Sequence, residues 1–145
     1  MSAEKTKALV RRLLDEMNNQ GNIAIIDELV APDFFEHEAP PPGIPRDREG
    51  VKTVFTMYHS AFSAIQATID DMIAEDDKVV SFMTVRATHT GEFAGIPATG
   101  KQVDVQVIDM FRVAGGQVKE HWGISDRLTM LQQLGVIPTE VSAIN

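Results

Sequence analysis

Residues 102–125 read QVDVQVIDMFRVAGGQVKEHWGIS, a pattern typical of two β-strands joined by a tight turn. Apolar and polar side chains alternate on both sides of Gly115-Gly116, as in strands that bury one face. Paired glycines suit a two-residue hairpin turn because both central positions need a positive φ. The stretch therefore predicts antiparallel strands over 102–114 and 117–125.

The flanking sequence predicts two more strands of this sheet, preceded by helices. Residues 65–75 and 78–90 alternate in the same way around Asp76-Asp77, and the loop 91–100 (GEFAGIPATG) joins them to the hairpin. Residues 33–38 read as a short extended segment. Apolar residues recur at helical spacing in four further stretches, over 4–19, 22–30, 47–64 and 126–134.

The proline-rich stretch 39–45 (APPPGIP) has four prolines within six residues and cannot be helical. In a chain of 145 residues, a surface loop or a lid over a pocket is favoured over a domain linker. Helices followed by a run of strands indicate the α+β class. We expect one domain over 1–145, in which a curved antiparallel sheet packs on three helices as a cone with a deep apolar pocket.

The charge balance excludes some partners. The chain has 13 Lys and Arg against 21 Asp and Glu, for a net charge of −8, which would repel nucleic acid and anionic membranes. No cysteine is present, which excludes a disulfide or a thiol nucleophile and suits the cytoplasm. No apolar run approaches the ~18 residues of a membrane span.

Asp109 is the one carboxylate on an otherwise apolar strand face, which also carries Val105 and Val107. A buried carboxylate needs a partner or a raised pKa, so Asp109 is either a paired structural group or a functional group. With a regular two-residue turn, Asp109 lies opposite Trp122. A one-residue bulge would instead place it on the same face as His121, where it could orient the imidazole for acid/base catalysis.

The other candidates have structural alternatives. His37 either lines a pocket mouth or caps the proline loop, and His89 is expected to anchor a loop. Asp126 precedes a helix and is favoured as an N-cap over a catalytic role. Trp122 and Tyr58 are core or pocket wall. A metal site from His37, His121 and Asp109 has no support from spacing, so no metal is expected.

The chain resembles the SnoaL-like polyketide cyclase family, whose fold is shared with nuclear transport factor 2, ketosteroid isomerase and scytalone dehydratase. The resemblance covers about residues 5–137. The matching residues are 32–34 (PDF), the helix near Gly50, 88–101 (THTGEFAGIPATGK), 111–113 (FRV), 116–122 (GQVKEHW), Asp126 and 131–135 (LQQLG).

The resemblance implies a homodimer or higher oligomer with a deep apolar pocket, and an intramolecular aldol ring closure without metal or cofactor. The family's catalytic Asp falls at Gly123, so that carboxylate is missing here. A pocket His of the family falls at Asp109 and an Asn at Glu36. These departures leave two possibilities open: an acid/base pair relocated to His121 and Asp109, or a different reaction.

The first hypothesis is a cofactor-independent enzyme that cyclises, isomerises or dehydrates a small apolar polyketide-like carbonyl compound. His121, Asp109 and His37 are its candidate catalytic residues. The candidate substrate-binding residues are Phe35, Glu36, Tyr58, His89, Val105, Val107, Trp122 and Asp126. The alternatives are an apolar-ligand binder or dimeric interaction module, and a hydroxylase or epoxide-opening relative.

Overall fold

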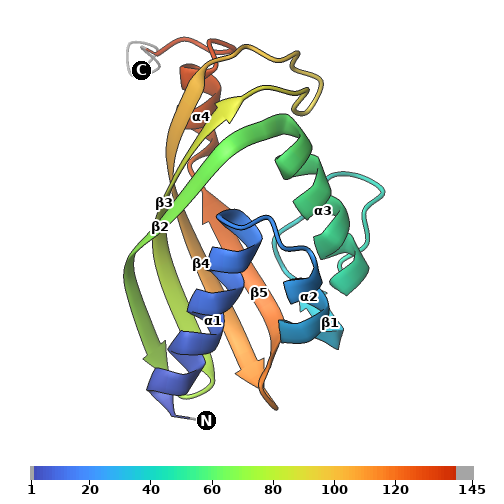
Figure 1. Ribbon diagram of the computed structural model, residues 1–145, viewed down its shortest axis with the longest axis vertical. Coiled ribbons are helices and arrows are strands. Elements are labelled where there is room, and N and C mark those ends of the chain that lie inside the picture. The colour runs from blue at the N-terminus through green and yellow to red at the C-terminus, as the bar shows by residue number, and fades with distance from the viewer. Residues whose placement is uncertain (1, 140–145) are drawn as a thin grey trace.

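A computed structural model describes residues 2–139 of the chain as a curved five-stranded sheet with helices on one face (Figure 1). Met1 and residues 140–145 of the predicted domain lie outside the described residues. The elements in chain order are α1 (Ala3–Asn18), α2 (Ala24–Leu29), β1 (Val30–Glu36), α3 (Arg48–Ala61), β2 (Phe62–Glu75), β3 (Lys78–His89), β4 (Gln102–Ala114), β5 (Gln117–Ser125) and α4 (Arg127–Gln133). This order confirms the α+β class.

Local sequence explains where the covering helices begin. Ser2 caps α1 by accepting a hydrogen bond from the Lys5 amide, and Asp47 caps α3 in the same way at the Gly50 amide. Helices α1, α2 and α3 cover one face of the sheet, as expected, while α4 packs against β4 near the far end (Figure 1). No helix among residues 2–139 is long and apolar enough to cross a membrane.

The four predicted strands pair antiparallel as β2, β3, β4 and β5, and β1 adds a fifth, parallel strand, so the sheet is mixed with the order β1-β5-β4-β3-β2. The short segment predicted over 33–38 belongs to β1, which runs parallel to β5 along its free edge. The pairing places Glu36 beside His121, and the His37 amide donates to the His121 carbonyl at 2.9 Å. The local sequence could not predict the pairing of β1 with β5, because the paired residues lie more than 80 positions apart.

A bulge in the β4–β5 hairpin decides which side chains share a face. Ala114 pairs with Gln117 as predicted, but the register shifts between Arg112 and Val113. Asp109 consequently lies opposite Gly123 instead of Trp122. The bulge thus places Asp109 and His121 on the same, helix-covered face of the sheet, which was one of the two registers that the sequence left open.

The covered face carries two groups of buried apolar side chains. One lies under α1 and α2 and includes Val10, Ile26 and Phe111, and the other lies toward α4 and includes Phe62 and Met130. Half-buried Val85 packs against both groups. Asp109 and His121 project from β4 and β5 on this same face.

Candidate active site

The imidazole of His121 lies between two carboxylates. Its Nδ1 is 2.6 Å from Glu36 Oε2 and its Nε2 is 2.7 Å from Asp109 Oδ1. Ionised carboxylates only accept hydrogen bonds, so both ring nitrogens must donate. The geometry therefore holds His121 as an imidazolium.

The electrostatics agree with this protonation state. Burial disfavours the charged ring, but the hydrogen bonds that it donates to Asp109 and Glu36 outweigh this and raise the pKa of His121 to about 10. The ring is therefore positively charged at neutral pH. As a cation, His121 orients Asp109 and offsets its negative charge.

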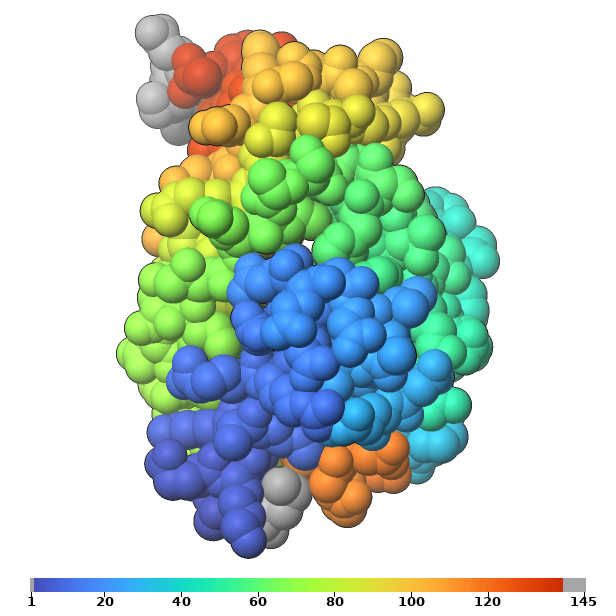
Figure 2. Space-filling view, viewed as in Figure 1, coloured from blue at the N-terminus to red at the C-terminus, as the bar shows by residue number. Residues whose placement is uncertain are grey.

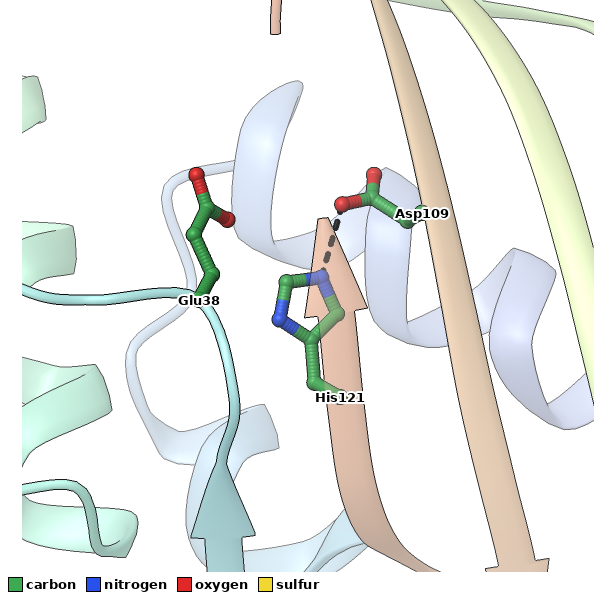
Figure 3. A group of neighbouring side chains, drawn as sticks. All are labelled: Glu38, Asp109 and His121. Atoms are coloured by element: carbon green, nitrogen blue, oxygen red, sulfur yellow. Dashed lines mark hydrogen bonds and ion pairs between the residues drawn. The ribbon is translucent and has the colours of Figure 1, made fainter. Parts of the chain in front are cut away.

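Glu38 is a third carboxyl group at this site. It lies in the loop after β1 and extends toward His121 and Asp109 (Figure 3). One oxygen or nitrogen from each of Glu38, Asp109 and His121 lies within 4.8 Å of the others. Burial raises the pKa of the Glu38 carboxyl; the His121 charge lowers it, and the Asp109 and Glu36 charges raise it. We call Glu36, Glu38, Asp109 and His121 the His121 cluster.

Glu38, Asp109 and His121 are also the described residues whose ligand atoms could hold a metal ion. An ion bound through His121 Nε2 would have to displace the proton that this nitrogen donates to Asp109. The other ring nitrogen, Nδ1, donates a hydrogen bond to Glu36. The arrangement thus favours a proton on the ring over a metal bound to it.

Several expected pocket residues lie on the same side of the sheet as the cluster. Val105 and Val107 precede Asp109 on its face of β4, and Val105 is buried. Tyr58 of α3 packs against the group of apolar side chains near Phe62, and burial raises the pKa of its phenol. Tyr58 therefore keeps its proton and offers a hydrogen-bond donor next to an apolar surface.

His37, Trp122 and Phe35 are not part of the His121 cluster. The His37 ring stacks on Trp122 at a centroid distance of 4.4 Å and bonds Glu120 at 2.9 Å. Phe35 is 45% exposed and contacts the edge of the His37 ring. Neighbouring residues of an extended chain point to opposite sides, so His37 and Trp122 face away when Glu36 and His121 face inward.

His89 and Asp126 have the structural roles favoured by the sequence. His89 is fully buried, and its Nδ1 lies 2.9 Å from Thr99 Oγ1 and accepts from the Thr99 amide, which anchors the loop between β3 and β4. Asp126 caps α4 by accepting hydrogen bonds from the Thr129 amide and hydroxyl. In the described part of the chain, neither side chain makes a hydrogen bond or ion pair with the His121 cluster.

The N-cap that Asp126 provides for α4 should contribute to the stability of the protein. Asp126→Ala should lower the melting temperature because the Thr129 amide loses its acceptor, whereas Asp126→Asn should stay close to wild type because asparagine caps equally well. Thermal denaturation followed by circular dichroism measures both. Equal losses in the two variants would show that the charge, and not the cap, is what matters.

Sequence reasoning missed Glu38, although the pattern contains a signal for it. In an extended Glu36-His37-Glu38 segment the two glutamates share one side and the histidine takes the other. The sequence prediction treated Glu36 and His37 as neighbouring candidates and did not consider that their side chains point to opposite sides. The structure instead brings Glu36 and Glu38 together at His121.

A separate groove of about 680 Å³ lies between α1 and the strands β2 and β3. Its lining mixes charged and apolar residues, among them Lys7, Arg11, Asp15 and Met83. Figure 2 shows this side of the molecule, where α1 lies across the face beside β2. The groove residues differ from those of the His121 cluster, so it is not the site described above.

The comparisons with known proteins agree with the fold and the resemblance. The model of the SnoaL-like polyketide cyclase family matches residues 8–134. The chain belongs to this family. It is 28% identical over 133 residues to aklanonic acid methyl ester cyclase DauD of Streptomyces sp. strain C5, which covers 88% of this chain and 80% of DauD.

Solved structures of the family superpose closely on this cyclase-family chain. TsrD from Streptomyces laurentii has a TM-score of 0.84 and 28% identity, over 94% of this chain and 99% of TsrD. IdmH from Streptomyces antibioticus has a TM-score of 0.79 and 37% identity, over 90% of this chain and 99% of IdmH. Related cyclases act on small polyketides, and a cyclase-type function is supported for the family member described here.

Proposed function

We propose that the chain closes a ring in a small polyketide ester by acid/base chemistry that needs no metal or cofactor. The single observation that carries the proposal is the buried Asp109 carboxylate, held by a charged His121 on the covered face of the sheet. DauD, which acts on aklanonic acid methyl ester, indicates the class of substrate. The apolar residues near the cluster suit such a compound.

Asp109 is the general base in this proposal. Its Oδ1 accepts from His121, while its Oδ2 makes no hydrogen bond to the described part of the chain. That oxygen is free to remove a proton from a carbon next to a carbonyl group. His121 cannot serve as the base because both of its nitrogens carry protons, so it acts as a positioning cation, and Glu36 fixes the ring from the other side.

The proposed function is tested with aklanonic acid methyl ester as the probe. Protein dialysed against a chelator should convert the ester to a ring-closed isomer of the same mass, detected by chromatography and NMR. Heat-denatured protein and buffer serve as controls. A protein that forms no product above buffer, or that forms it only after a metal is restored, would contradict the proposal.

We also propose that the uncovered face of the sheet joins two copies of the chain. Adjacent strands place apolar side chains side by side there, since Ile108 pairs with both Phe82 and Ile124. Ile124 is 78% exposed and Ile73 64% exposed. Apolar side chains gathered on one solvent-facing surface are typical of a protein–protein interface.

The dimer proposal predicts that one substitution separates the copies. Wild-type protein should have about twice the chain mass of 16.0 kDa, and Ile124→Lys should have the mass of one chain because a charge would be buried in the interface. Light scattering coupled to size exclusion measures both. Ile23→Lys, at an exposed position beside α2, is the matched control, and equal masses for all three proteins would refute this interface.

A further inference from the structure

Gly123 and Glu38 compete for one volume in the His121 cluster. A Cβ added at Gly123 would lie 2.6 Å from Glu38 Oε1, 2.8 Å from Asp109 Oδ1 and 2.8 Å from His121 Cε1. These distances are shorter than real Cβ contacts. Glycine at 123 therefore leaves the space that the Glu38 carboxyl occupies, in a strand where a side chain would otherwise point into the cluster.

The surroundings of Glu38 differ from those of the other two carboxylates. Glu36 and Asp109 each accept a hydrogen bond from His121, whereas the Glu38 carboxyl makes none with the described residues. Its charged form would face the carboxylates of Glu36 and Asp109 and the cations of His121 and Arg127. Burial, which disfavours the charged form, raises the pKa of Glu38, so Glu38 retains a proton more readily than a free glutamate.

We propose that Glu38 is the proton donor of the site and that Gly123 is required to make room for it. This inference rests on the proposed function and adds the second half of its acid/base pair. Two neighbouring carboxyl groups in unlike environments can divide the work of base and acid between them. The loop after β1 supplies the acid, and β4 supplies the base.

The proposed step balances without a further reactant. Asp109 takes a proton from the carbon next to one carbonyl, and the electron pair of that C–H bond forms the enolate. The enolate carbon bonds to a second carbonyl carbon of the same molecule, whose π electrons move to its oxygen. Glu38 gives its proton to that oxygen. A proton then passes from Asp109 to Glu38 directly or through water, which restores both groups.

The test follows aklanonic acid methyl ester in D₂O with two readouts, deuterium exchange into unreacted ester and ring closure. Glu38→Gln should keep the exchange, because Asp109 still removes the proton, and lose ring closure about 100-fold. Asp109→Asn should lose both. The matched control is Glu92→Gln, in the exposed loop before β4, which should behave as wild type.

Each outcome bears on one proposal. Normal ring closure by Glu38→Gln, or loss of exchange together with closure, would overturn the role of Glu38. Wild-type protein that neither exchanges nor closes the ester would contradict the proposed function itself. Carboxyl ¹³C NMR then decides whether Glu38 carries a proton. The pKa of Glu38 should lie above the ordinary glutamate value in wild type and fall back toward it in Asp109→Asn. A Glu38 pKa at or below the ordinary value overturns the inference.

Moving the carboxyl group from position 38 to position 123 tests whether the two side chains compete for the same space. Gly123→Asp alone should lower both the melting temperature and ring closure because its Cβ crowds Glu38. Glu38→Ala/Gly123→Asp should recover part of both losses, since the new carboxyl enters the vacated space. Losses that simply add in the double variant would show that the two positions act independently.

Discussion

Asp109→Asn should lower ring closure about 10²–10⁴-fold while the chain stays folded. The amide oxygen of asparagine can still accept from His121 Nε2, so the packing and the 2.7 Å hydrogen bond have a replacement. What the variant loses is a carboxylate able to take a proton. Steady-state rates with aklanonic acid methyl ester measure the effect, and circular dichroism checks the fold.

The control for Asp109→Asn lies on the same strand. Asp104→Asn changes an exposed carboxylate of β4 that pairs with Arg86, away from the cluster, and should leave the rate within about twofold of wild type. Comparable losses in the two variants would point to general damage to β4. Full activity in Asp109→Asn would remove Asp109 from the chemistry and leave it a structural partner of His121.

His121→Ala should destabilise the protein by about 3–5 kcal/mol, because it removes the cation that pairs with the buried Asp109 and the partly buried Glu36 carboxylates. Glu36, Glu38 and Asp109 would then face one another across the cavity that the ring leaves. Chemical denaturation at neutral pH measures the free energy of unfolding of wild type and variant.

The pH dependence of this loss gives a second check. The pKa of His121 is about 10 in the folded chain and ~6.5 in an unfolded one, so its stabilisation is complete below pH ~6.5 and disappears as the pH rises through about 10. The stability difference between wild type and His121→Ala should therefore shrink between these values. The control is His37→Ala, because the His37 ring bonds Glu120 outside the cluster. In this variant the free energy of unfolding should change with pH as it does in wild type. A constant difference would contradict a raised pKa at His121.

The strands of this fold could be predicted from the sequence because each carries its own alternation and turn residues. Residues 102–114 and 117–125 show this, and both strands have the predicted bounds. The position of β1 could not be predicted, since a short parallel edge strand depends on contacts with β5 far along the chain.

The candidate site could be predicted only where local geometry determines it. Asp109 was recognisable as a carboxylate on an apolar face, but one bulged residue of β5, Lys119, decided whether Asp109 would meet His121. Glu38 was missed although it alternates with His37 in the same way as Glu36, because its contact with His121 depends on the pairing of β1 with the distant β5. The outward orientation of His37 followed from the same alternation that turns Glu36 inward.

The central claim is that His121 is a charged group that holds Asp109 as the base. The most direct measurement is ¹H–¹⁵N NMR of the His121 ring from pH 6 to pH 10, assigned with His121→Ala. Both ring nitrogens should stay protonated at pH 8, with loss of a proton only near pH 10. A ring that loses its proton near the ordinary value of ~6.5 would contradict the account, since a neutral His121 could itself act as the base.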